Sequence, residues 1–253
     1  MNIIEAFIKY RGQLVILISG MSGCGLTQLC KTMSDDLGLS MIGYNKYCVE
    51  NYDVKVKLPS GVEMINWDTD EIVEWESFIN DINKNKSKGV IAYGQSFPSS
   101  KIDNKFTPDV HIHIKISKKN LLKRRQDYNK RHQDECEKIP DQEIDLTLFN
   151  NLTYPYYMGT VQNSHITKFI NGNDYIDSKD YDKKIADETF AYVTKFIEEW
   201  LNEYDRTKKT KTEEKKDTET KKKTSNYKLK DPIYDDENDD EKEESDSELE
   251  SDE

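Results

Sequence analysis

The sequence predicts an α/β fold of three layers, with a mainly parallel sheet between helices, followed by a charged tail. Short aliphatic runs alternate with segments of helical period from residue 3 to residue 201. Residues 14–18 are apolar on both faces, which is typical of a central parallel strand. A glycine-rich turn follows this run and leads directly into a helical pattern. A strand, a tight turn and a helix in this order predict an anion site at the helix N-terminus.

The first elements follow from the spacing of apolar residues. Helical spacing over residues 3–8 predicts a short helix before the strand at 14–18. The pattern over 27–37 predicts a second helix, which Gly38 ends. A second strand is expected at 39–44.

The middle of the chain predicts a hairpin or loop, then a helix and a strand. Residues 59–61 read Pro-Ser-Gly, which is a turn sequence. Asp68 or Thr69 can cap a helix whose apolar stripe covers residues 72–82. Residues 89–97 predict a third strand.

The last part of the domain predicts two strands and two helices. Apolar alternation over 109–117 indicates a strand, and a basic helix follows at 118–132. A final strand is expected at 165–170. The strong amphipathic pattern over 185–201 predicts the last helix.

Charge divides the chain into a domain and a tail. Residues 1–204 carry a net charge of −5, residues 205–230 carry +6, and residues 231–253 carry −13. We expect residues 205–253 to be disordered, because they have almost no apolar side chains to bury. The basic half can contact nucleic acid or another phosphate surface, and the acidic half can bind a basic protein. A purely solubilising tail is the alternative.

Cysteine content and hydropathy predict an intracellular protein, cytoplasmic or otherwise, that is not secreted. The four cysteines show no CxxC spacing, which favours reduced thiols. The apolar run at residues 14–18 is too short to span a bilayer and leads into the glycine turn rather than a cleavage site. We therefore expect no membrane association.

The glycine-rich turn matches the phosphate-binding P-loop pattern except at its lysine. Gly20, Gly25 and Thr27 fall in register, and Leu26 stands where the pattern has lysine. Backbone N–H groups of such a loop hold a β-phosphate, and the hydroxyl ligates magnesium. Losing the lysine charge costs on the order of 10² to 10⁵ in transfer rate. The residues expected to bind ATP with magnesium, Thr27 also as the metal ligand, are Gly20, Ser22, Gly23, Cys24, Gly25, Leu26 and Thr27.

The order of several motifs resembles the uridine kinase and nicotinamide riboside kinase group of P-loop small-molecule kinases. "SGMSGCGLTQL" (residues 19–29) resembles the glycine loop of that group, and "INWDTDEIVEW" (65–75) its Asn-Trp/Phe-Asp motif. "ISKKNLLKRRQDYNKRH" (116–132) resembles the lid, and "YPYYMGTVQNSHITKFING" (154–172) resembles the segment that leads to the last strand. The resemblance extends from residue 14 to about residue 200.

The resemblance implies transfer of the γ-phosphate of ATP to a small nucleoside-like hydroxyl acceptor. It assigns Asp68 to a substrate or metal contact, although a helix cap is an equally simple role. It also implies that lid arginines close over the phosphates, whereas exposed basic helices are common for other reasons. The lid arginines are Arg124, Arg125 and Arg131.

Three departures from the family pattern put catalysis in doubt. Leu26 replaces the lysine, the acidic residue after the second strand has no clear counterpart, and Tyr93 replaces the glutamate of the third strand. Lys46 or Lys31 can in principle supply the missing ammonium. Three hypotheses remain: an impaired nucleotide-binding protein, an active kinase, and a scaffold or adaptor that acts through its tail.

Two further features have a structural and a functional interpretation. His111 and His113 lie on the same face of a strand and can chelate a metal, but no third ligand is evident and a structural role is favoured. Cys24 is placed near a helix N-terminus, which can activate a thiol. The simpler role of Cys24 is to fill the loop.

Overall fold

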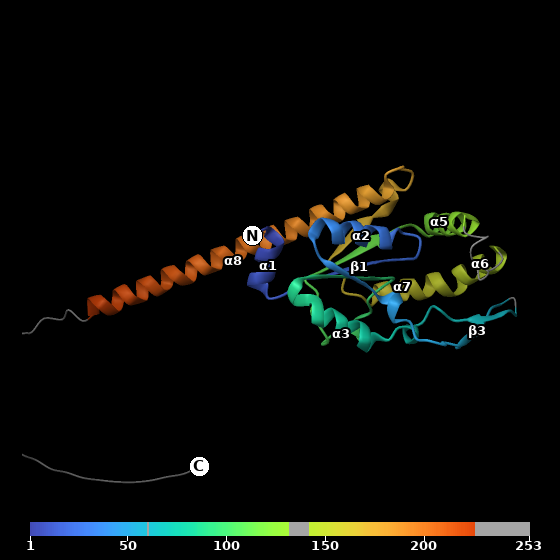
Figure 1. The fold of residues 1–253 in the computed structure, drawn as a ribbon, viewed down its shortest axis with the longest axis horizontal. Helices are drawn as coiled ribbons and strands as arrows, with labels where there is room; N and C mark the ends of the chain where they lie inside the picture. The colour runs from blue at the N-terminus through green and yellow to red at the C-terminus, as the bar shows by residue number, and fades with distance from the viewer. Residues whose placement is uncertain (60, 132–141, 226–253) are drawn as a thin grey trace, which may run out of the picture. The chain divides into compact units, whose positions relative to one another are not determined.

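The computed structural model describes residues 1–59, 61–131 and 142–225 (Figure 1). The chain divides into two compact units, Met1–Asp205 and Arg206–Glu253. The sheet and both cavities described below belong to the first unit.

A five-stranded sheet forms the centre of this unit, with the strand order β2-β5-β1-β6-β7 and every neighbouring pair parallel. The strands are β1 (Val15–Gly20), β2 (Ser40–Gly43), β5 (Val90–Gly94), β6 (Val110–Lys115) and β7 (Lys168–Asn171). All of β1 is buried, because it has a strand on each side and side chains packed on both faces. Ser19 of β1 pairs with Gly94 of β5 and His113 of β6.

Helices cover both faces of the sheet (Figure 1). They are α1 (Ile3–Arg11), α2 (Leu26–Leu37), α3 (Trp75–Asn85), α4 (Ser99–Ile102), α5 (Lys118–Arg131), α6 (Gln142–Leu148), α7 (Tyr154–Gln162) and α8 (Tyr181–Ser225). Ile16 and Ile18 of β1 belong to the core that contains side chains of α1, α2 and α8, whereas Val15 and Leu17 belong to the core with α3. The predicted three-layer α/β fold with a mainly parallel sheet is confirmed.

Short helical turns connect several of these elements. They are η1 (Tyr44–Tyr47), η2 (Asp70–Ile72), η3 (Lys86–Lys88), the π-helical turn η4 (Phe149–Thr153) and η5 (Gly172–Tyr175). The segment before α3, for which a hairpin or a loop was expected, forms a hairpin: β3 (Lys55–Lys57) pairs antiparallel with β4 (Glu63–Ile65).

The helix expected after Asp68 or Thr69 begins later than predicted. Thr69 caps only the single turn η2, where its side chain accepts the N–H of Glu71. Val73, the residue after η2, is extended and forms an isolated antiparallel bridge with Cys48. This long-range pairing interrupts the helix, so α3 starts at Trp75.

Two further predictions about the second half of the domain are corrected. The alternation at 109–117 suggested one polar face for β6, but His111 and His113 are as buried as their neighbours Ile112 and Ile114. No helix is expected from the sequence between residues 142 and 162, yet α6, η4 and α7 follow one another there. Asn150, Asn151, Pro155 and Gly159 interrupt that segment, and such residues are typical of turns, so its sequence does not indicate a continuous helix.

The last helix is longer than the pattern predicted. It was expected to end at residue 201, but α8 continues to Ser225. The extension is rich in Lys and Glu and contains neither Gly nor Pro, a composition that favours helix. Residues 226–253, the larger part of the predicted disordered tail, lie outside the described residues, so disorder there stays a prediction. No helix in the described part of the chain has both the length and the apolar character needed to cross a membrane.

Candidate functional site

The turn between β1 and α2 has the backbone that a phosphate loop requires. Gly23 and Gly25 have φ angles of 94° and 85°, a left-handed conformation that favours glycine. Gly25 is the residue before α2, and within the described chain no side chain caps this helix. The N-cap residue therefore offers no side-chain acceptor to the first turn of α2, although the Leu26 N–H donates to the Cys24 thiol. A helix N-terminus without an N-cap side chain is a condition for an anion site.

Cys24 fills the loop rather than offering a reactive thiol. Burial raises the pKa of the Cys24 thiol to about 12, although the N–H of Leu26 donates to it. A Cβ atom on Gly20 would lie 2.6 Å from the sulfur, so the two residues fit each other closely. The Tyr181 hydroxyl donates to the Cys24 carbonyl at 3.1 Å. These contacts support the loop-filling role.

A cavity of about 960 Å³ opens over the loop. It brings together the glycine loop, the ends of β2 and β5, and the helix α5. The residues named for ATP that line it are Gly20, Ser22, Gly23, Gly25, Leu26 and Thr27, and the additional lining residues are Met21, Gln28, Tyr44, Asn45, Tyr93, Gly94, Gln95, Asn120, Lys123, Arg124, Arg125, Asp127, Asp145, Ile176 and Asp177.

The lid arginines have different partners. Arg124 donates from Nε to the Gly23 carbonyl at 2.6 Å, and its guanidinium lies 4.2 Å from the centre of the Tyr181 ring. Arg125 is held by the buried carboxylate of Asp145, with Nη2–Oδ1 at 2.7 Å and Nε–Oδ1 at 3.0 Å. Arg131 ends α5, and its side chain lies outside what is described. Of the two lid arginines whose side chains are described, Arg124 is therefore the one bonded to the loop itself.

Asp68 does not line this cavity. Its Oδ2 accepts the Thr153 hydroxyl at 2.7 Å, and its N–H donates to Asn66. Burial raises the pKa of the Asp68 carboxyl. Thr153 lies in the π-helical turn η4, which the sequence does not predict. The Asp68 carboxylate is thus used in a contact that only the fold creates.

The proposed replacements for the missing lysine also lie elsewhere. Lys31 and Lys46 are exposed and are not among the residues that line the cavity. Lys123, one position before Arg124, does line it. Sequence reasoning missed this lysine, although the basic run at 123–125 was a usable signal.

Electrostatically the cavity is balanced. Among the described residues that line it, three are cationic and three are carboxylates. The cations are Lys123, Arg124 and Arg125, and the carboxylates are Asp127, Asp145 and Asp177. The lining therefore has no net formal charge to attract an anion at long range.

The histidine pair is structural. Ser19 bridges the two rings, with its Oγ 2.8 Å from His111 Nε2 and 2.8 Å from His113 Nδ1. The far nitrogen of His111 bonds the His165 carbonyl, and that of His113 bonds the Tyr157 hydroxyl. All four ring nitrogens are thus used, and no group of three potential metal-binding side chains occurs among the described residues.

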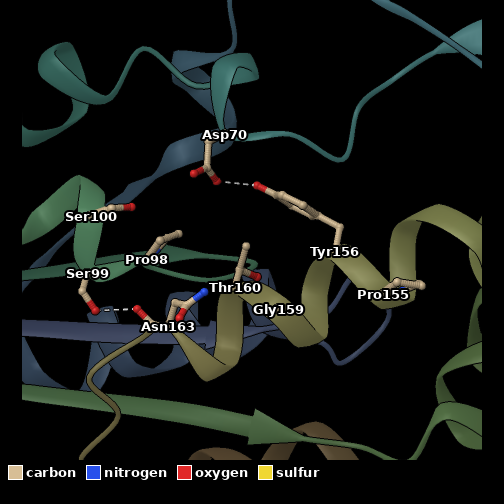
Figure 2. Close-up of a pocket in the computed structure, with 9 residues that line it drawn as sticks. All are labelled: Asp70, Pro98, Ser99, Ser100, Pro155, Tyr156, Gly159, Thr160 and Asn163. Carbon is tan, nitrogen blue, oxygen red and sulfur yellow. Dashed lines mark hydrogen bonds between the residues drawn. The ribbon is translucent and has the colours of Figure 1, made fainter.

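A second cavity, of about 420 Å³, lies between η2, α4 and α7 (Figure 2). The Tyr156 hydroxyl donates to Asp70 at 2.7 Å, and Lys101 lies 3.7 Å from the same carboxylate. Ser99, Ser100, Thr160 and Asn163 add hydroxyl and amide groups. This cavity shares no lining residue with the first, and it was not predicted from the sequence.

Comparisons with known proteins give similarity in structure but not in sequence. No family model and no curated protein matches the sequence. The chain is similar to the solved structure of a gluconokinase from Sinorhizobium meliloti 1021, with 13% identity, a TM-score of 0.45, and coverage of 75% of this chain and 96% of that one. It is also similar to the solved structure of a sugar kinase from Janibacter sp. HTCC2649, with 11% identity, a TM-score of 0.45, and coverage of 72% of this chain and 95% of that one.

A third similar structure is the shikimate kinase from Acinetobacter baumannii in complex with shikimate, with 13% identity and a TM-score of 0.41, covering 75% of this chain and 97% of that one. The narrower resemblance to the uridine kinase and nicotinamide riboside kinase group stays a hypothesis.

Proposed function

We propose that this protein binds the phosphates of a purine nucleotide weakly at the glycine loop and is impaired in phosphate transfer. The observation that supports binding is the loop itself, with Gly23 and Gly25 in left-handed conformations ahead of a helix that no described side chain caps. Arg124 is bonded to this loop, and Lys123 lines the same cavity. Both can pair with phosphate oxygens.

The balanced charge of the cavity supports weak binding. Arg125 and Asp145 neutralise each other, which leaves Lys123 and Arg124 against two further carboxylates. Leu26 is partly buried and packs against the core, so it adds no charge at the phosphates. A phosphate held mainly by backbone N–H groups and one arginine lacks the additional charge-assisted contact that a lysine supplies.

Impaired transfer is supported by the positions of the acidic side chains. A general base must come within hydrogen-bond reach of the acceptor hydroxyl. Asp68 accepts a hydrogen bond from Thr153 outside the loop cavity, and Tyr93 lies where the family pattern has glutamate. Neither position offers a carboxylate beside Thr27.

Isothermal titration of the full chain with ATP, with and without magnesium, tests the proposal. We expect binding in the high micromolar to millimolar range, and we expect Arg124→Ala to weaken it about tenfold, the scale of one charge-assisted hydrogen bond. Lys31→Ala is the matched control, because it removes an exposed lysine outside the cavity. No heat up to millimolar ATP in either buffer would remove the proposal.

An active kinase for a small hydroxyl acceptor is the second candidate. The second cavity favours it, because a carboxylate and several hydroxyl and amide groups suit a ligand rich in hydroxyl groups. ATP consumption stimulated by a nucleoside or polyol, and abolished by Asp70→Asn, would support this candidate. The scaffold or adaptor role, with nucleic acid or a basic protein as partner, rests on a tail mostly outside the described residues. It stays a proposal, as does the intracellular location.

A further inference from the structure

Tyr93 is locked at the end of β5 beside the glycine loop. In the parallel register of β2 and β5 it pairs with Gly43. A Cβ atom on Gly43 would lie 2.6 Å from Cζ and 2.7 Å from the hydroxyl of Tyr93, so the tip of the ring occupies the space that any larger residue would need. Tyr44 occupies the corresponding space over Gly94, 1.9 Å from its Cβ position. The two tyrosine–glycine contacts fix both rings.

The Tyr93 hydroxyl lies close to the side chain of Thr27, which lowers the pKa of Tyr93 against the larger effect of burial. Thr27 carries the hydroxyl that the loop pattern assigns to magnesium. The Tyr93 side chain is almost fully buried, and burial raises its pKa, so the hydroxyl stays neutral. A neutral phenol thus lies against Thr27, at a position where the family pattern has a carboxylate.

The other side chains at this end of the cavity are neutral as well. Magnesium prefers oxygen ligands that include one or two carboxylates together with phosphates and water. Asn45 and Gln95, which follow β2 and β5, offer only amides. The carboxylates that line the cavity come from elsewhere: Asp127 from α5, Asp145 from α6 and Asp177 from the segment after η5. The donor set around Thr27 therefore does not fit a magnesium site.

Donors in the same wall suit phosphate directly. The Nε2 atom of Gln95 is buried and has no hydrogen-bond partner among the described residues. Because a buried donor without a partner costs free energy, an acceptor such as a phosphate oxygen would be favoured there. Arg124 and Lys123 supply charge from the lid side.

We infer that the glycine loop binds its nucleotide as the free anion, without a divalent cation, because the Tyr93 hydroxyl takes the place of the carboxylate that would hold the metal beside Thr27. This inference rests on the proposed nucleotide binding. It also accounts for impaired transfer, since the metal that neutralises charge on the transferring phosphoryl group would have no protein carboxylate to hold it.

The test is a calorimetric titration of the full chain with ATP in excess EDTA and in excess magnesium. Ionic strength is matched in the two buffers, because the acidic segment at 231–253 attracts any cation. We expect affinities that agree within about threefold, or tighter binding in EDTA. Binding about tenfold or more tighter with magnesium would overturn the inference while leaving nucleotide binding intact. Absence of binding in both buffers would overturn the proposed function and this inference together.

Two substitutions at one position sharpen the result. Tyr93→Glu places a carboxylate beside Thr27, and we expect its ATP affinity to become about tenfold stronger in magnesium than in EDTA. Tyr93→Phe is the matched control, because it keeps the ring over Gly43 and removes only the hydroxyl, and it should stay independent of magnesium. Thermal unfolding of both variants shows whether they fold. If Tyr93→Glu does not fold, a magnesium-dependent Tyr93→Phe would still contradict the inference, and a magnesium-independent one would support it.

Discussion

The buried histidines make the stability of the domain depend on pH. The hydrogen-bond chain through them has one proton arrangement. The His165 carbonyl can only accept, so His111 carries its proton on Nδ1 and its Nε2 accepts from Ser19. Ser19 in turn accepts from Nδ1 of His113, whose Nε2 accepts from the Tyr157 hydroxyl. A second proton on either ring would face another donor, so both rings are held neutral.

The expected effect follows from the pKa difference between the folded and unfolded states. Burial lowers the pKa of His111 and of His113 to about 4. The nearby His165 also lowers the pKa of His111. The nearby His111 and Lys115 also lower the pKa of His113. An unfolded histidine titrates near pH 6.5, so between that value and pH 4 only the unfolded state gains protons. The free energy of unfolding therefore has its full value above about pH 6.5. It falls as the pH is lowered, by about 2 kcal/mol per histidine at pH 5.

Urea unfolding at pH 7 and pH 5 measures this loss. For the two histidines together we expect about 4 kcal/mol, a large part of the 5–15 kcal/mol that domains typically have. His113→Gln should remove roughly half of the pH dependence. His165→Gln is the control, because its exposed side chain leaves the backbone acceptor in place. A loss below about 1 kcal/mol in the parent chain, or an unchanged pH dependence in His113→Gln, would refute the reasoning.

Three further predictions concern the loop, the lid and the tail. Leu26→Lys should tighten ATP binding by roughly 1–3 kcal/mol, because it adds a charge-assisted contact; unchanged affinity in calorimetry would mean that the loop does not hold phosphate. Asp145→Asn should tighten ATP binding by about 1 kcal/mol, because it frees Arg125 and leaves the cavity with a positive net charge; equal or weaker binding in the same titration would show that cavity charge does not limit affinity. Deleting residues 206–253 should change the melting temperature little, because this segment is almost free of apolar residues; a melting temperature many degrees lower in calorimetry would show that it packs on the domain.

Local sequence was sufficient for the parts of this protein that depend on neighbouring residues. The apolar run of β1, the glycines of the turn and the period of α2 lie within one short segment, so the loop and its order in the fold were predictable. The same holds for the alternation of strands and helices that predicts a parallel sheet. The long Lys- and Glu-rich extension of α8 was not predicted, because it has almost no apolar residues and therefore shows no amphipathic period.

Tertiary structure alone decided which side chains reach the loop. Tyr93 lies near Thr27 because β5 is paired with β1, which leads through the glycine turn into α2, and Arg125 is neutralised because α6 brings Asp145 against it. Asp68 accepts a hydrogen bond from the Thr153 hydroxyl, although the motif around Asp68 resembles a substrate site. Each of these contacts joins residues that lie between 20 and 85 positions apart in the sequence. No local pattern contains that information, because such pairings depend on how the packed core orders the strands and helices.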